Sequence, residues 1–146
     1  MSIRQATKYQ RAREVNLMAN QKELDLLSTG KTLWNTWRRE YAEIHTLELD
    51  LHEADLHSAD LQGFDLLNAD LTGANLQGAD LRNADLRKAN LSDANLVKAH
   101  LRWADLRGAA LCRSNLKGAI LIGANFDGAH LSSIQIDGAD FTEVPL

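Results

Sequence analysis

Leucine recurs at every fifth position along most of the chain. The pattern is unbroken in the segment LTGANLQGADLRNADLRKANLSDANL, which runs from Leu71 to Leu96. Neither regular secondary structure keeps such residues on one side. An α-helix turns about 100° per residue and would spread the leucines around its circumference, while a β-strand would place consecutive leucines on opposite faces. The spacing therefore predicts a chain that bends once in every five residues.

Nineteen of these positions, which we call centres, run from Leu51 to Phe141. Sixteen centres are leucine, and the exceptions are Phe126, Ile136 and Phe141. The residue two before the centre (minus-two) is alanine in fifteen repeats, and the residue one before it (minus-one) is Asp or Asn in fourteen. Centre and minus-two lie two positions apart, so in an extended segment both point to the same side, and this side is apolar.

The polar positions of the repeat indicate where the chain bends. Eight of the nine glycines stand two residues after a centre (plus-two). Glycine suits the third residue of a type II turn, where φ is positive. Asp or Asn at minus-one offers a side-chain oxygen to nearby backbone N–H groups. The unit Ala-(Asp/Asn)-Leu-polar-(Gly/polar) thus predicts a coil with Leu and Ala inside and polar residues outside.

The run ADLHSADLQGFDLLNADLTGANLQGADLRNADLRKANLSDANL resembles the A(D/N)LXX units of the pentapeptide-repeat family. The resemblance covers residues 49–146 and implies a mainly β solenoid, a right-handed quadrilateral β-helix with four repeats in each coil and nearly five coils. Residues twenty apart would then stack in columns. At about 4.8 Å per coil, the tower would be roughly 23 Å tall.

Residues 1–48 lack the repeat and predict an N-terminal helical segment. Asn20 followed by Glu23 is a capping-box signature, and Gly30 is a stop signal for the same helix. A second, amphipathic helix is predicted in KTLWNTWRREYAE, and an earlier one in residues 3–15. The stretch LLSTGKTLWNTWRREYAEI also resembles the helical lead of many bacterial, especially cyanobacterial, pentapeptide-repeat proteins.

An open solenoid end exposes apolar side chains and unpaired backbone, so it needs a cap. We expect the second helix to lie over the first coil. Phe64, which replaces alanine in that coil, would fill the space beneath it. The expected cap residues are Leu33, Trp34, Trp37 and Tyr41.

Net charge and composition limit the classes of partner. The chain carries a net charge of −4, with a balance of +2 in residues 1–48 and −6 in residues 49–146. Direct nucleic-acid binding calls for a basic surface and is not expected. The single cysteine, Cys112, fits a reducing compartment, and no apolar run approaches the roughly 18 residues that cross a membrane. We therefore expect a cytoplasmic protein without a membrane association.

The predicted shaft is filled by its own side chains and offers no concave pocket for a small ligand. Groups on the flat outer walls are exposed to water, where pKa tuning and electrostatic preorganisation are weak. The interpretation is a protein with no catalytic residues, no cofactor and no metal site. The histidines of the repeat region agree with this, because no two of them share a column: His52, His57, His100 and His130.

Two neighbouring walls of the predicted tower collect arginines, because Arg82 stacks with Arg102 and Arg87 stacks with Arg107. Apolar side chains stand beside them at positions that are polar in most repeats. These are Trp103, Ile120 and Ile122. An apolar patch with a polar rim on a regular wall predicts a contact surface for a protein partner.

The last coil carries enlarged apolar residues. If two such ends met in a homodimer, both open edges would be covered. The alternative is a monomer. The residues of this possible dimer end are Ile134, Ile136, Phe141, Val144 and Leu146.

The leading interpretation is a non-enzymatic binding or scaffold module for a protein partner whose identity the repeat does not encode. One alternative comes from family members that resemble duplex DNA in size and charge and act on DNA gyrase. Nine Asp residues at minus-one agree with it, whereas the arginine walls and the short tower disagree. Docking of residues 1–20 onto a larger assembly is another alternative, and an enzyme is the least favoured.

Overall fold

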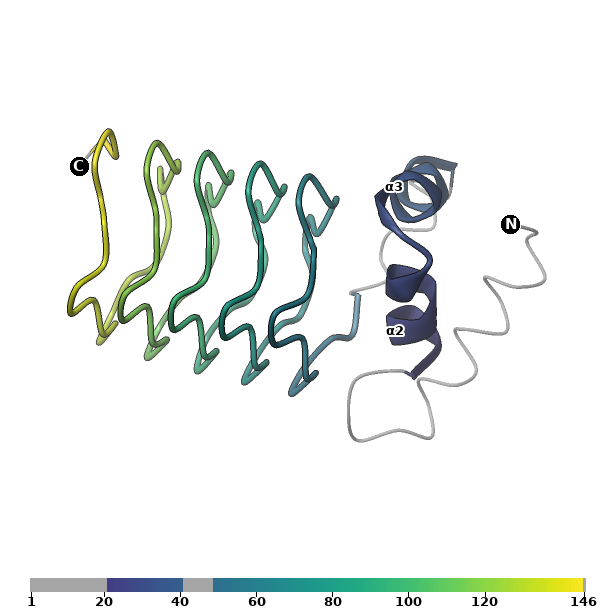
Figure 1. The fold of residues 1–146 in the computed structure, drawn as a ribbon, viewed down its shortest axis with the longest axis horizontal. Helices are drawn as coiled ribbons and strands as arrows, with labels where there is room; N and C mark the ends of the chain where they lie inside the picture. The colour runs from purple at the N-terminus through teal and green to yellow at the C-terminus, as the bar shows by residue number, and fades with distance from the viewer. Residues whose placement is uncertain (1–20, 41–48, 146) are drawn as a thin grey trace.

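The computed structural model describes residues 21–40 and 49–145. Two helices, α2 (Gln21–Ser28) and α3 (Lys31–Glu40), lie together at one end of a solenoid that the remaining residues form (Figure 1). The helix expected in residues 3–15 lies outside the described part of the chain. Neither α2 nor α3 is long and apolar enough to span a membrane.

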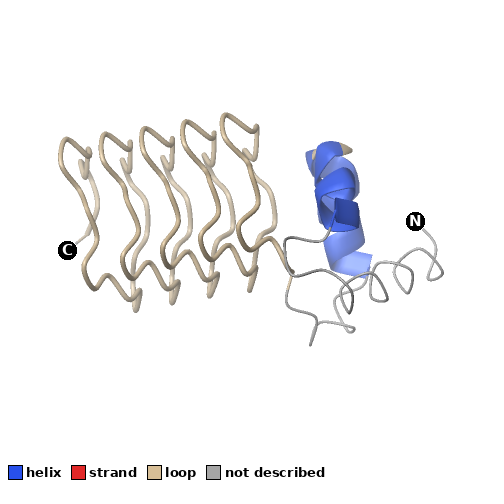
Figure 2. Ribbon diagram, turned by 90° about the horizontal axis from the view of Figure 1, so that it is seen from below, coloured by secondary structure: helices blue, strands red, loops and turns tan. Residues whose placement is uncertain are grey.

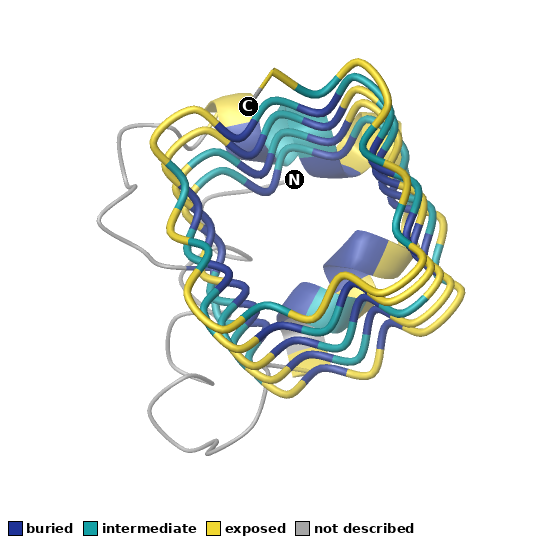
Figure 3. Cartoon of the chain, turned by 90° about the vertical axis from the view of Figure 1, so that its left-hand side faces the viewer, coloured by how far each residue is buried: buried dark blue, intermediate teal, exposed yellow. Residues whose placement is uncertain are grey.

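Each coil of the solenoid contains twenty residues and four repeats. The minus-one residues of successive coils pair through single parallel β-bridges, from Asp50↔Asp70 to Ile120↔Asp140. Viewed down its axis, the solenoid is a four-sided frame (Figure 3). The expected β-structure is sparse, because each repeat contributes one bridging residue and the described residues form no longer strand (Figure 2).

The predicted turn is present in every repeat. All nineteen plus-two residues have a positive φ, and only eight of them are glycine. In eighteen of the nineteen repeats the centre C=O accepts a hydrogen bond from the N–H three residues later, as from Ala74 to Leu71 at 3.0 Å. The minus-one side chain accepts a bond from the plus-one N–H, as from Thr72 to Asp70 Oδ1 at 3.0 Å. Asp and Asn are interchangeable at minus-one because both offer this oxygen.

Backbone hydrogen bonds join each coil to the next. The Leu71 N–H donates to the Asn90 C=O at 2.8 Å, and the Asn90 N–H donates to the Ala69 C=O at 2.9 Å. The plus-two N–H completes the set, as from Gly73 to the Ser92 C=O at 2.9 Å. Each repeat therefore forms up to three backbone hydrogen bonds with the next coil. In the first and last coils, some of these backbone N–H and C=O groups have no neighbouring coil to bond to.

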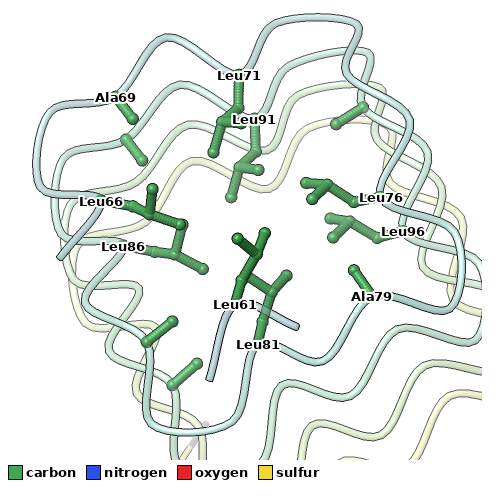
Figure 4. Close-up of a cluster of buried hydrophobic side chains, with 14 of the residues drawn as sticks. Leu61, Leu66, Ala69, Leu71, Leu76, Ala79, Leu81, Leu86, Leu91 and Leu96 are labelled. Carbon is green, nitrogen blue, oxygen red and sulfur yellow. The ribbon is translucent and has the colours of Figure 1, made fainter. Parts of the chain in front are cut away.

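Leucine and alanine side chains fill the shaft. Leu66 stacks on Leu86 and Leu71 on Leu91, and all four are fully buried (Figure 4). Full burial of one leucine side chain contributes about 1.5–3 kcal/mol, so the stacked columns supply most of the stability of the solenoid. Ser114 is an exception, because it is fully buried at a minus-two position.

Helix α3 covers the first coil with Trp34, which is 0% exposed. The Trp34 ring centroid lies 5.5 Å from that of Trp37 and 6.3 Å from that of Phe64. Phe64 thus lies beneath the helix, as its size predicts. Leu33 differs from the expectation, because it is 60% exposed and takes no part in this core. Tyr41 lies outside the described residues.

Polar side chains of α3 also bond to the open edge of the first coil. Trp34 Nε1 donates to the Asp65 C=O at 2.7 Å. The Asn35 amide accepts a bond from the Asp65 N–H at 2.8 Å and donates to the Gly63 C=O at 2.9 Å. In the second coil, Asp85 occupies the position of Asp65, and its N–H and C=O bond to the backbone of the first coil. The first coil has no coil before it, so the side chains of Trp34 and Asn35 provide these bonds to Asp65.

Two buried charged residues extend this cap. The Arg38 Nη2 donates to the Leu67 C=O at 2.6 Å, and the Glu23 Oε2 of α2 accepts a bond from the Asp50 N–H at 2.9 Å. Glu23 was expected to close a capping box with Asn20, which lies outside the described residues. In the structure, Glu23 connects α2 to the first coil.

Candidate partner surface

The apolar residues expected at a partner surface lie together on one wall. The β-bridge between His100 and Ile120 stacks their repeats, which makes Arg102 and Ile122 neighbours in one column. The Trp103 N–H donates to the Ile122 C=O at 2.9 Å. We call Arg102, Trp103, Ile120 and Ile122 the Trp103 patch.

Trp103 is 55% exposed and has a φ of 57°. A left-handed backbone is a genuine departure for a bulky residue and costs roughly 1–2 kcal/mol. The ring is nevertheless held on two sides. It packs against Gly123, where an added Cβ would lie 2.7 Å from Nε1, and the Arg102 guanidinium lies 5.5 Å from the ring centroid, within the range of a cation–π interaction.

The two isoleucines are half-buried on the same wall. Here the repeats also lack the usual side-chain acceptor, because His100 and Ile120 occupy minus-one positions that hold Asp or Asn in most repeats. The N–H groups of Arg102 and Ile122 therefore lack the side-chain bond that stabilises the turn elsewhere.

Three of the expected arginines are neutralised within their own repeats. Each forms a two-point ion pair with the minus-one carboxylate: Arg82 with Asp80, Arg87 with Asp85, and Arg107 with Asp105. The side-chain hydrogen bonds of Arg82 and Arg107 hold the pKa of Asp80 and the pKa of Asp105 below their usual values. The expected basic walls are therefore rows of ion pairs, and Arg102, which follows His100, is the arginine that contacts the indole.

The residues of the possible dimer end surround the last coil. Ile136 is 46% exposed, and the Phe141 ring centroid lies 6.3 Å from that of Phe126. Ile134, Phe141 and Val144 are half-buried. Leu146 lies outside the described residues. The last described coil thus presents more apolar surface than the coils within the tower.

A groove of about 760 Å³ lies between α2 and the first coil. Leu24, Leu27 and Leu56 contribute apolar lining, and Lys31 and Asp60 are among its polar residues. A protein without a concave pocket was expected from the filled shaft alone, and this groove lies outside the shaft. Phe64, which lies beneath α3, also lines the groove, so the groove continues to the edge of the cap.

The histidines of the solenoid and the cysteine lie on the outside. Cys112 is half-buried, and its Sγ lies 3.9 Å from the His130 C=O. His52 lies beside the carboxylates of Asp50 and Asp70. The spacing of the histidines from one another does not indicate this group, because its other two ligands are carboxylates. The twenty-residue column of Asp50 and Asp70 would have revealed it.

Comparison with protein families identifies the repeat. The chain matches the family described as pentapeptide repeats over residues 50–87, 74–111 and 104–142. A pentapeptide repeat protein from the thylakoid lumen of Arabidopsis thaliana is 39% identical, with a TM-score of 0.62. The match covers 63% of this chain and 64% of that one, so the chain spans less than two thirds of the length of this relative.

Bacterial structures are similar over comparable lengths. A pentapeptide repeat protein from Nostoc is 34% identical over 70% of this chain and 74% of that chain, with a TM-score of 0.40. QnrB1, a plasmid-mediated fluoroquinolone resistance protein, is 25% identical over 63% of this chain and 57% of that chain, with a TM-score of 0.31. No curated protein matches the chain. The family match and the likeness to the Arabidopsis protein imply a right-handed quadrilateral β-helix.

Proposed function

The chain belongs to the pentapeptide-repeat family, and on that premise we propose that it is a non-enzymatic protein-binding module whose contact surface is the Trp103 patch. The observation that carries the proposal is the exposure of Trp103. A large aromatic side chain stands 55% exposed at a plus-two position, which is polar or glycine in every other repeat. Its positive φ is shared by all nineteen plus-two residues and belongs to the repeat, so the exposed indole beside two isoleucines is what marks an interaction surface.

The chemistry of the patch favours a protein partner. Trp and Arg are the residue types that most often dominate binding energy in protein interfaces. The indole is held between Arg102 and Gly123, so little conformational entropy is lost when it binds. Ile120 and Ile122 add apolar area, and the ion pair of Arg82 with Asp80 provides a polar rim. A fitting partner has an apolar cavity for the indole and a carboxylate or carbonyl for Arg102.

The non-enzymatic part of the proposal is supported by the shaft. Its leucines and alanines are almost fully buried from Leu66 to Ala124, so they leave no room for a substrate inside the tower. The arginine–carboxylate pairs outside it are mutually satisfied and partly exposed. Family members of this type are generally structural or binding modules.

A DNA-mimicking, gyrase-interacting protein is the alternative. The likeness to QnrB1 has a TM-score of only 0.31 and carries no argument for it. The ion pairs of Asp80, Asp85 and Asp105 also reduce the continuous negative charge that mimicry of duplex DNA needs. A gyrase supercoiling assay tests this alternative, and inhibition or protection at stoichiometric protein would revive it.

The division of the chain into a helical cap (residues 1–48) and a solenoid (residues 49–146) remains part of the proposal. A second copy of the chain is a candidate occupant of the last coil, where Ile136 is exposed. Sedimentation equilibrium at high protein concentration tests this, because a monomeric mass would exclude the homodimer. The cytoplasmic location also stays a prediction, and the lumenal location of the Arabidopsis relative belongs to that protein.

The test uses the purified chain as bait in a lysate of its source organism, with bound proteins identified by mass spectrometry. The dissociation constant of each purified candidate is then measured for the wild type and for Trp103→Asn. Asparagine tolerates the left-handed backbone, so the substitution removes the ring without adding strain. We expect binding to weaken at least about 30-fold, as for a residue that contributes about 2 kcal/mol.

Arg113→Asn is the matched control, because Arg113 is also an exposed plus-two residue, with a φ of 62°. This substitution should leave the affinity within about twofold. Equal affinity of the wild type and Trp103→Asn for every partner would move the contact surface away from the patch. Loss of binding in both variants would point to a general effect on the tower.

A further inference from the structure

Three metal-ligating side chains meet on the outside of the first two coils. A carboxylate oxygen of Asp50, a ring nitrogen of His52 and a carboxylate oxygen of Asp70 all lie within 4.8 Å of one another. All three residues are half-buried. The group lies on a different wall from the Trp103 patch, and inferences about it do not depend on the proposed function.

The backbone fixes the two carboxylates one above the other. Asp50 and Asp70 are joined by a parallel β-bridge. On one side of it, the Leu51 N–H donates to the Asp70 C=O at 2.8 Å, and on the other, the Asp70 N–H donates to the Leu49 C=O at 2.7 Å. The Glu23 side chain also accepts a bond from the Asp50 N–H. Little rearrangement would therefore be needed to bring the ligand atoms around an ion.

The third ligand is placed by the geometry of the repeat. His52 is the plus-one residue that follows Asp50, and its Nδ1 contacts Asp50 Oδ1. Asp70 uses Oδ1 to accept a bond from the Thr72 N–H at 3.0 Å. A carboxylate has two oxygens, so Asp70 retains a second one for an ion while it stabilises its turn.

In every other bridged pair of carboxylates among the described residues, at least one member has an arginine partner. Asp85 and Asp105, for example, are bridged one above the other, and Arg87 lies 2.7 Å from the first and 3.8 Å from the second. At Asp50 and Asp70 the basic neighbour is a histidine. Two carboxylates on successive coils repel each other, and a bound cation would remove this repulsion.

We propose that Asp50, His52 and Asp70 bind a divalent transition-metal ion of the Zn²⁺ class. Two carboxylate oxygens and one imidazole nitrogen form a ligand set that Zn²⁺ accepts in tetrahedral geometry, with the fourth position open to water. Imidazole favours such ions over Mg²⁺ and Ca²⁺, which prefer oxygen ligands alone. The ion would join the first coil to the second beside the helical cap, and binding would stabilise this end of the tower.

The chain contains a matched control site. Asp55 and His57 repeat the local pair, with 2.8 Å between Nδ1 and Oδ1, but the residue one coil later is Asn75, whose Nδ2 donates to Asp55 at 3.2 Å. That site has the same contact between a histidine and the minus-one carboxylate, but it lacks the second carboxylate and is more exposed. Comparison of the two sites therefore tests whether a histidine–carboxylate pair alone binds the ion.

The experiment is a calorimetric titration with Zn²⁺, repeated with Mg²⁺, on the wild type and on Asp70→Asn, His52→Gln and His57→Gln. Asp70→Asn keeps the turn bond, because Asn75 Oδ1 makes the same bond to the Gln77 N–H. We expect one strong Zn²⁺ site in the wild type and in His57→Gln. Affinity should fall by more than about tenfold in Asp70→Asn and His52→Gln, since even residues behind the ligands change metal affinity by about 10–100-fold.

A second measurement guards against misfolded variants. Circular dichroism and the melting temperature without metal should show that each variant is folded, and Zn²⁺ should raise the melting temperature of the wild type and of His57→Gln alone. The proposal is overturned if the folded wild type binds no Zn²⁺, if folded Asp70→Asn and His52→Gln bind it as tightly as the wild type, or if Mg²⁺ binds equally well.

Discussion

The indole of Trp103 occupies the space in which a side chain at Gly123 would begin. An added Cβ would lie 2.7 Å from Nε1 and still nearer to Cδ1. Gly123 is thus needed for two reasons: its φ of +66°, and the ring on the preceding coil. Gly118 has the same φ of +66°, but there a Cβ would meet only the Lys98 Cγ, at 3.5 Å, which is an ordinary contact.

The first prediction compares Gly123→Ala with Gly118→Ala. Both should lower the free energy of unfolding by about 1 kcal/mol, because alanine disfavours a positive φ. Gly123→Ala should in addition displace the Trp103 ring, so that acrylamide quenches a larger fraction of the tryptophan fluorescence. Urea unfolding and quenching measure the two effects. Identical quenching in both variants would show that the ring does not rest on residue 123.

The second prediction concerns the cap. Trp34→Ala should lower the free energy of unfolding by about 3–5 kcal/mol, as expected for loss of a buried aromatic residue. Asn35→Ala should cost about 1–3 kcal/mol, because it leaves the Asp65 N–H and the Gly63 C=O without their partner. Leu33→Ala, at the exposed neighbour, is the control and should change stability by less than about 0.5 kcal/mol. An unchanged melting temperature in Trp34→Ala would exclude α3 as the cap.

The repeat and the cap differ in how far the sequence predicts them. The leucines, such as Leu71 and Leu91, follow a strict spacing, and the same local geometry recurs nineteen times. The residue types alone therefore predicted the turn at plus-two and the hydrogen-bond acceptor at minus-one. The hydrophobic spacing also identified Trp34 and placed Phe64 beneath it. Leu33 was wrongly assigned to the buried face, because a spacing of three to four residues does not distinguish a residue on the buried face of a helix from the residue next to it.

The polar contacts depend on which segments meet in space. Asn35 and Arg38 bond to the first coil only because α3 lies over its edge, and no local pattern marks them as cap residues. The arginine columns were foreseen, but their charge was overestimated, since Arg87 also lies 3.8 Å from Asp105 on the next coil. Contacts between coils depend on which residues stand twenty positions apart in one column, and residue type alone does not predict them.

The third prediction concerns Ser114, which is fully buried where most repeats have alanine. Its Oγ has no hydrogen-bond partner within the described part of the structure, and an unsatisfied buried hydroxyl costs about 1–3 kcal/mol. Ser114→Ala should therefore raise the free energy of unfolding by roughly 1 kcal/mol in urea titrations. Ser132→Ala, at an exposed position, should have no measurable effect. A less stable Ser114→Ala variant would show that the hydroxyl is bonded in solution.

The fourth prediction concerns acid. The side-chain hydrogen bond from Arg107 lowers the pKa of Asp105 in the folded protein, and the charge of Arg87 adds to this. A carboxyl group whose pKa is lower in the folded than in the unfolded state stabilises the fold above its unfolded pKa, which is about 3.9 for Asp. This contribution is lost as the pH falls below that value towards the folded pKa. The free energy of unfolding should thus decrease between about pH 5 and pH 3.

Asp105→Asn separates the charge of this residue from its role in the turn. Asparagine retains an oxygen for the Arg107 N–H, as Asn115 does for the Lys117 N–H at 3.1 Å, but it forms no ion pair. The variant should be less stable than the wild type at pH 7 and should lose less stability on acidification. Asp127→Asn is the control, because Asp127 is an exposed plus-one residue that forms no ion pair among the described residues. If Asp105→Asn and the wild type lost equal stability between pH 7 and pH 3, the ion pair would not contribute to the acid response.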